Sequence, residues 1–433
     1  MATHTPQPTP LDVDPSSLPL SLATCSIGLP RHTLHQKLEA ISHAGFGGIE
    51  LSLPDLVTHA EELVRLGRIK QGDTTTTSSS SDKDKDKTVR VAQDDWPALR
   101  EAATSAAHLC ATHNLRIILL QPFANLEGWP RGSPQRDAAF ARARGWLGIM
   151  EAAGCDTLQV GSTDAAAPST TADRGLLAAD LAELADLLRP AGRRVAYENW
   201  CWATRAPGWR DAWELVRLAG RDNVGLCLDT FQSAGGEWGD PTAASGRRLG
   251  GDEVGEGDAE AAWQAGLREL AATVPADKIY LLQVSDAYRA DPPLSPDDDD
   301  DDDNKTGLRP RARWSHDCRP LPYDDGGYLP VADFTRAVLG TGFRGWLSVE
   351  VFDGRFGEKY GDDLRGSSSP AGRPGQPCSM QAQRLQRIRG NYQGETRALP
   401  SGQDWPRSHS AVEERDEVVQ ARASIPQETG GGS

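Results

Sequence analysis

Short runs of apolar and β-branched residues recur along the chain, and each is followed by a polar or glycine-rich stretch and then by a segment with helical periodicity. Eight of these runs predict β-strands. The predicted strands are residues 21–27, 48–53, 116–121, 157–161, 194–199, 224–229, 278–284 and 346–351. Their apolar positions are nearly continuous rather than alternating, which is typical of parallel strands covered by helices.

The segments between the strands predict helices. These are residues 34–44, 92–113, 136–153, 172–188, 209–219, 259–273 and 331–339. Eight strand and helix units predict a (β/α)8 TIM barrel over residues 20–360, since this fold commonly takes about 250 residues plus insertions. The alternative is a doubly wound open sheet. No G-x-G-x-x-G follows the first strand and no G-x-x-x-x-G-K-[ST] occurs, so the usual nucleotide-binding fingerprints are absent and the barrel is favoured.

Several segments have too little apolar content to offset the entropy of ordering them. Residues 72–87 read GDTTTTSSSSDKDKDK, and residues 291–308 surround a run of aspartates. Both are predicted to be disordered polar insertions in loops. Residues 1–19 are predicted to be a disordered N-terminus, and residues 361–433 a mostly disordered tail with one short helical pattern at 380–389.

The charge balance argues against a nucleic-acid partner. Lys and Arg total 46 against 62 Asp and Glu, and seven of the acidic residues lie in the run at 297–303. A basic footprint is therefore missing. No stretch approaches the 18 or so apolar residues of a membrane span, and no secretory signal pattern opens the chain. Seven cysteines without a C-x-x-C indicate a reducing compartment. We expect a cytoplasmic protein, and the sequence does not indicate its oligomeric state.

The polar residues that end the later strands carry the candidate chemistry, because barrel enzymes place their sites at the carboxyl ends of the strands. Four successive strands end at Glu198, Asp229, Gln283 and Glu350. Three carboxylates facing one mouth would repel one another without a cation. Three carboxylates and one amide oxygen match the ligands of Mg²⁺ or Mn²⁺, so we predict a divalent metal site. The alternative, four unrelated surface residues, is less consistent with four adjacent strands.

Several motifs carry a resemblance to known enzymes. The segment IGLPRHTLHQKLEAISHAGFGGIEL, with Glu50 at the end of the second strand, resembles the xylose-isomerase-like barrel superfamily of isomerases, epimerases and lyases. Five further motifs resemble more narrowly the fungal 3-dehydroshikimate dehydratases of quinate catabolism. They are LQPFANLEGW, YENWCW, GLCLDTFQSAGGEWGDP, YLLQVSDA and WLSVEVFD. The resemblance spans about residues 20–355.

This resemblance implies a lyase that uses a divalent metal to dehydrate 3-dehydroshikimate, a small carboxylate, to protocatechuate. In these dehydratases a Ser-x-x-x-Arg element helps to hold the substrate, which implies that role for Ser315 and Arg319. The QPF motif implies a substrate-binding role for Gln121. Independently of the resemblance, a guanidinium is the natural partner of a carboxylate, although Arg319 could equally be a solvated loop arginine.

One position departs from the family pattern. Bacterial members have a histidine three residues after the metal-binding aspartate, whereas this chain has Gln232, which cannot accept a proton at neutral pH. His316 is the nearest candidate for a catalytic acid or base, and the alternative is that it caps a loop. Trp129, Trp200 and Trp202 follow strand ends, where they would either wall a pocket or pack around the barrel mouth.

Two other functions stay open at this stage. A sugar isomerase or epimerase would use the same metal but would contact hydroxyl groups instead of a carboxylate. A non-catalytic barrel scaffold would account for Gln232 and for the polar insertions. Retention of all four predicted ligands argues against the scaffold, because it would have no reason to keep buried negative charges.

Overall fold

The computed structural model describes residues 18–70, 89–248, 256–295, 308–322, 324–361 and 364. The insertion predicted at 72–87 lies outside the described residues. So do residues 296–307 of the second predicted insertion, residues 1–17, and the predicted tail beyond 364, including its helical pattern at 380–389.

Eight parallel strands close into a barrel in the order β1, β2, β3, β4, β5, β6, β7, β9. Their bounds are Leu20–Ala23, Gly48–Ser52, Arg116–Phe123, Thr157–Gly161, Arg194–Glu198, Val224–Asp229, Ile279–Val284 and Trp346–Val349. The barrel closes where β1 pairs with β9, with Leu20 opposite Leu347. The predicted (β/α)8 barrel is confirmed, and every predicted strand overlaps an observed one.

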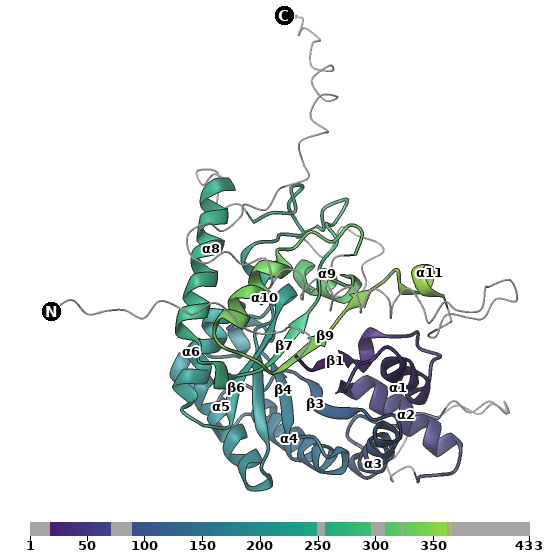
Figure 1. Cartoon of the computed structure of the whole chain (residues 1–433). Helices are drawn as coiled ribbons and strands as arrows, with labels where there is room; N and C mark the ends of the chain where they lie inside the picture. The colour runs from purple at the N-terminus through teal and green to yellow at the C-terminus, as the bar shows by residue number, and fades with distance from the viewer. Residues whose placement is uncertain are drawn as a thin grey trace, which may run out of the picture.

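Helices surround the strands (Figure 1). Their bounds are α1 Leu34–His43, α2 Leu53–Arg65, α3 Trp96–Thr112, α4 Pro134–Ala153, α5 Arg174–Leu188, α6 Trp209–Ala219, α7 Thr230–Glu237, α8 Glu256–Thr273, α9 Pro310–Asp317, α10 Val331–Gly340 and α11 Phe356–Tyr360. The sequence did not predict α2, α7, α9 or α11. Helices α7, α9 and α11 are too short to show a clear period. Helix α2 follows β2 directly, with Ser52 as its N-cap, so no polar break separates the two elements.

Helix α3 begins four residues later than the sequence predicted. The side chain of Asp95 accepts a hydrogen bond from the backbone N–H of Ala98, and Pro97 occupies the first turn. An aspartate N-cap followed by proline is a strong signal for the start of a helix. The aspartate side chain accepts a hydrogen bond from a backbone N–H of the first turn that would otherwise be unpaired, and proline has no N–H that would need a partner there. The helix therefore starts at Trp96 rather than at Ala92.

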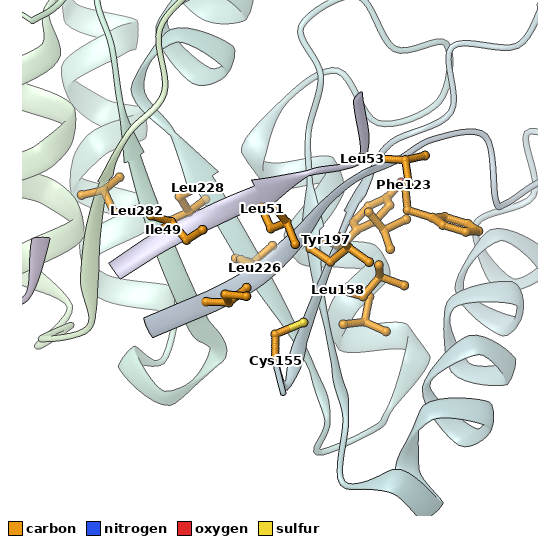
Figure 2. Packing of buried hydrophobic residues seen from close by; sticks show 14 of the residues in the cluster. Ile49, Leu51, Leu53, Phe123, Cys155, Leu158, Tyr197, Leu226, Leu228 and Leu282 are labelled. Atoms are coloured by element: carbon orange, nitrogen blue, oxygen red, sulfur yellow. The ribbon is translucent and has the colours of Figure 1, made fainter. Parts of the chain in front are cut away.

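The apolar core lies between the outward faces of the strands and the helices. Figure 2 shows part of it, with Ile49 and Leu51 on β2, Leu226 and Leu228 on β6, and Leu282 on β7, all fully buried. Side chains alternate between the two faces of a strand. The residues next to these leucines and isoleucine therefore face the barrel interior, and it is there that the polar residues of the strands are placed.

A small ribbon lies beyond the carboxyl ends of β7 and β9. It consists of β8 (Cys318–Arg319) and β10 (Phe352–Asp353), which pair antiparallel with Arg319 opposite Phe352. The chain reaches β8 through α9. The ribbon joins the segment that follows β7 to the segment that follows β9. It holds Arg319 near the end of β9, next to Glu350.

Candidate active site

A ring of buried polar side chains lines the barrel mouth. Each strand from β2 to β7 contributes one, and the last follows β9. They are Glu50, Gln121, Gln159, Glu198, Asp229, Gln283 and Glu350, each at most 5% exposed. Carboxylates and amides hydrogen-bond to one another within this ring, so its charges are held in fixed positions without direct access to bulk water.

Three of the predicted metal ligands come together in this ring. Oxygen atoms of Glu198, Asp229 and Glu350 lie within 4.8 Å of one another. Burial, together with the neighbouring charges of Glu350 and Asp229, raises the pKa of Glu198 well above its usual range. Burial likewise raises the pKa of Glu350 to about 7. Ionisation of this cluster is therefore unfavourable unless a cation compensates it.

Arg319 supplies one compensating charge. Its guanidinium is only 1% exposed, and Nη2 donates to Asp229 and, at 3.0 Å, to Glu350. Nε and Nη2 also donate to the hydroxyl of Ser285, at 3.1 and 2.8 Å. Among the described residues, Nη1 makes one long contact, 3.5 Å to the hydroxyl of Ser315. Nη2 of the guanidinium thus donates hydrogen bonds to the carboxylates, whereas Nη1 can donate a further hydrogen bond.

The donor set fits a hard divalent cation. Oxygen Oε1 of Glu198 is buried and has no hydrogen-bond partner among the described residues. The oxygens of the three carboxylates lie within 4.8 Å of one another, and carboxylate oxygens are the donors that Mg²⁺ or Mn²⁺ would take.

The fourth predicted ligand, Gln283, lies in the same ring, since β7 pairs with β6 so that Gln283 is opposite Asp229. Its Nε2 donates to Glu50 at 2.8 Å, and its Oε1 accepts from the thiol of Cys227 at 3.2 Å. The predicted substrate ligand Gln121 is also in the ring, where its Nε2 donates to Glu350 at 2.9 Å and to Glu50 at 3.2 Å.

Sequence analysis missed the role of two ring members. Gln159 donates to Glu198, and Glu50 accepts from two glutamines of the ring. The available signal was the same for both residues. Each is a lone polar side chain inside an apolar strand run, at the strand position that points into the barrel.

Aromatic side chains line one side of the mouth. The indole of Trp200 donates to Glu198 at 3.2 Å and stacks on Trp202, with ring centroids 5.1 Å apart. The ring of His316 follows, 6.3 Å from Trp202 and 6.2 Å from Phe352. Trp129 is engaged differently, because its indole donates to the carbonyl of Asn125 in its own loop.

His316 and Gln232 occupy different surroundings. His316 lies in the last turn of α9, where the residue is partly exposed but its ring lies beside Trp202 and Phe352. Desolvation of the ring lowers its pKa, which favours the neutral imidazole. Gln232 is 2% exposed, and its Oε1 accepts from the backbone N–H of Cys201 at 3.0 Å. Gln232 thus holds the loop that carries the two tryptophans.

Gly161 makes room for the first of these tryptophans. A Cβ atom at Gly161 would lie 2.1 Å from the indole of Trp200. We expect Gly161→Ala to displace this ring from Glu198 and to lower the free energy of unfolding by roughly 1 to 3 kcal/mol. Urea unfolding measures this change. Gly257→Ala on α8 is the control, because open space surrounds that position. Equal stabilities for Gly161→Ala and the unmodified protein would contradict the role of Gly161.

The buried carboxylates predict a pH dependence for the metal-free protein. Burial raises the pKa of Glu50 to about 8 and that of Glu350 to about 7. A carboxyl group whose folded-state pKa is raised contributes stability that is complete below its unfolded pKa, about 4.3, and is lost as pH rises through the folded pKa. Urea unfolding should therefore give a lower free energy at pH 8 than at pH 6. Glu50→Gln should flatten this slope, and an equally steep slope in that variant would contradict the assignment to Glu50.

A separate hollow of about 910 Å³ lies outside the mouth, between α6, α7 and α8. Charged side chains line it, but they pair with one another. Arg210 contacts Glu237 at 3.2 Å, and Arg311 contacts Asp240 at 3.6 Å. The hollow does not include the carboxylate cluster, so we assign the chemistry to the barrel mouth.

Comparisons with known proteins give matches over most of the chain. Residues 85–369 match the family model described as xylose isomerase-like TIM barrel. The chain is 30% identical over 357 residues to the 3-dehydroshikimate dehydratase of Neurospora crassa, covering 79% of this chain and 89% of the relative. It is also 30% identical to the 3-dehydroshikimate dehydratase of Pseudomonas aeruginosa, covering 78% of this chain and 38% of that longer protein.

Solved structures show the same architecture. A xylose isomerase-like TIM barrel/4-hydroxyphenylpyruvate dioxygenase fusion protein superposes with a TM-score of 0.52 at 25% identity, over 77% of this chain and 39% of the fusion. An IOLI protein with a binding zinc atom superposes with a TM-score of 0.51 at 16% identity, over 80% of this chain and 94% of that one. The second likeness concerns the fold alone. In the described part of the chain, no helix has the length and apolar character needed to cross a membrane.

Proposed function

Because the chain belongs to the xylose isomerase-like TIM barrel family, we propose that it is a hydro-lyase that dehydrates 3-dehydroshikimate to protocatechuate. The single observation that carries this proposal is Arg319 beside the buried carboxylates of Glu198, Asp229 and Glu350. A cation site next to a guanidinium suits a substrate that carries both a ketone and a carboxylate. Three relatives at 27 to 30% identity are named 3-dehydroshikimate dehydratase.

In this proposal Glu198, Asp229, Glu350 and Gln283 hold Mg²⁺ or Mn²⁺. The bound cation supplies Lewis-acid stabilisation of the negative charge that develops on the ketone oxygen. Nη1 of Arg319 and the hydroxyl of Ser315 are proposed to hold the substrate carboxylate, since both lie at the same edge of the site. Gln121 is proposed to contact the substrate from the opposite side of the ring, beside Glu350.

The remaining residues shape the pocket and move protons. Trp200 and Trp202 offer a flat apolar wall for the six-membered ring of the substrate. A base removes the proton next to the ketone, and the neighbouring hydroxyl group takes up a proton and leaves as water. Transfer of one further ring proton to the ketone oxygen then makes the product ring aromatic. His316 is our candidate for this proton transfer, because it is neutral and adjoins Trp202 at the mouth.

The proposal places the protein in the cytoplasm. Six described cysteines are free thiols, namely Cys25, Cys110, Cys155, Cys201, Cys227 and Cys318. Free thiols are usual in a reducing compartment.

The proposed partner is a small-molecule carboxylate.

The test is an ultraviolet assay of protocatechuate formation from 3-dehydroshikimate, run before and after treatment with a chelator. We expect activity to disappear with the chelator and to return when Mg²⁺ or Mn²⁺ is added in excess. Aldose and ketose substrates form the matched control, because a sugar isomerase would turn them over. Activity that is unaffected by the chelator, or turnover of sugars alone, would contradict the proposed function.

A further inference from the structure

Glu50 is buried in the mouth without a role in the proposed reaction. It lies on β2, across the ring from the carboxylate cluster, and is 0% exposed. Its oxygen Oε1 is buried and makes no hydrogen bond of normal geometry among the described residues, although the hydroxyl of Ser348 is close enough to lower the pKa of this carboxyl. Burial of a carboxyl group costs free energy unless hydrogen bonds or an ion pair compensate it.

The other oxygen of Glu50 joins two glutamine amides. Oε2 accepts from Nε2 of Gln283 at 2.8 Å and from Nε2 of Gln121 at 3.2 Å. The second amide hydrogen of Gln121 is used by Glu350, at 2.9 Å. Oε2 of Glu50 on β2 thus links Gln283 on β7 to Gln121 on β3, and Gln121 continues the link to Glu350 after β9.

These contacts determine which way the amide of Gln283 faces. An amide can be turned so that either its oxygen or its NH₂ group faces a neighbour. Facing the oxygen toward Oε2 of Glu50, which already accepts from Gln121, would place two acceptors against each other, whereas the observed orientation pairs donor with acceptor. The carbonyl oxygen of Gln283 is thereby kept for the side of β6, where Cys227 now donates to it at 3.2 Å and Asp229 is its register partner.

We propose that Glu50 is a positioning residue whose Oε2 fixes the amides of Gln283 and Gln121, so that Gln283 presents an oxygen rather than an NH₂ group to a divalent cation. This inference rests on the proposed function, because it takes the cation site as given. Partners that orient a metal ligand typically change metal affinity by about 10- to 100-fold when they are removed.

The role requires an acceptor at Oε2 and no negative charge, which makes the substitutions informative. In Glu50→Gln the new carbonyl oxygen can take the place of Oε2, and the new NH₂ group takes the place of Oε1, where the hydroxyl of Ser348 can accept from it. In Glu50→Leu no acceptor is left. We expect Glu50→Gln to bind Mn²⁺ within about threefold of the unmodified protein, and Glu50→Leu to bind it about 10- to 100-fold more weakly.

The experiment is titration of the full-length chelator-treated protein with Mn²⁺, by calorimetry and without substrate. Equal affinities for Glu50→Leu and the unmodified protein would overturn the proposal. Equally weak binding by Glu50→Gln and Glu50→Leu would also overturn it, because the charge and not the acceptor would then be needed. Absence of Mn²⁺ binding by the unmodified protein would instead refute the proposed function.

If Glu50→Leu does not fold, the proposal can be tested by exchanging the two side chains, so that residue 50 carries the amide donor and residue 283 the carboxyl acceptor. Gln283→Glu alone replaces the amide donor that faces Oε2 of Glu50 by a carboxyl oxygen, while it also adds a charged ligand for the cation. Adding Glu50→Gln restores a donor opposite an acceptor, so the double variant should bind Mn²⁺ at least about tenfold more tightly than Gln283→Glu. Lack of any such gain in the double variant would overturn the inferred contact.

Discussion

Glu198→Ala should abolish turnover and stoichiometric metal binding while leaving the barrel folded. The substitution removes one coordinating charge at the end of β5 and creates no cavity in the apolar core between strands and helices. Loss of Lewis-acid stabilisation is worth several kcal/mol, so we expect kcat to fall by at least about 10²- to 10³-fold. Elemental analysis and the protocatechuate assay measure the two losses.

The matched control for Glu198→Ala is Glu101→Ala, which removes an exposed glutamate from α3. This variant should keep its metal and its activity. Glu350→Ala should behave like Glu198→Ala, because both residues supply oxygens to the same cluster. Stoichiometric metal retained in both cluster variants would show that these residues are not ligands.

Substitution of Arg319 should distinguish a 3-dehydroshikimate dehydratase from a sugar isomerase. Arg319→Ala removes the guanidinium, whereas Arg319→Lys keeps a charge without the planar fork. A charge-assisted hydrogen bond is worth roughly 1.5 to 3 kcal/mol. The alanine variant should therefore lose about 10- to 150-fold in kcat/KM on 3-dehydroshikimate, and the lysine variant should lie between it and the unmodified protein.

Arg319→Ala has a second expected effect, on stability. The guanidinium pairs with Asp229 and Glu350, so its removal leaves two buried carboxylates without a positive partner. Removing one partner of a buried pair costs about 3 to 5 kcal/mol. Saturating Mn²⁺ should restore much of this loss and so raise the melting temperature more in the variant than in the unmodified protein. Unchanged kinetics in the alanine variant would refute the role of Arg319 in substrate binding.

The sequence was sufficient to predict the barrel and the carboxylate cluster. Strands β5, β6 and β9 are mostly apolar runs that end in a carboxylate or are directly followed by one, and closure of the barrel brings those ends to one mouth. The convergence of Glu198, Asp229 and Glu350 follows from this rule alone. The chemistry of a site can be predicted in this way when its residues lie at equivalent positions of repeated units.

The contacts of Arg319 could not be predicted in the same way. They depend on a two-residue ribbon, β8 with β10, whose strands are far too short to show a pattern. The link from Glu50 to Gln121 and Gln283 likewise joins strands that are distant in sequence through side-chain orientation. Such contacts are set by packing in three dimensions, which periodicity along the chain does not encode.

The pairing of Arg319 with two carboxylates bears on how the protein would respond to loss of the proposed ion. Many small metal-binding domains unfold when the metal is withdrawn, because nothing else offsets the charges of the ligands. Here a guanidinium from the protein itself already lies against Asp229 and Glu350, and the surrounding core is apolar and closed. The proposed ion would thus be dispensable for shape, and a single chelator-treated preparation could be loaded with different divalent metals in turn to rank them by activity.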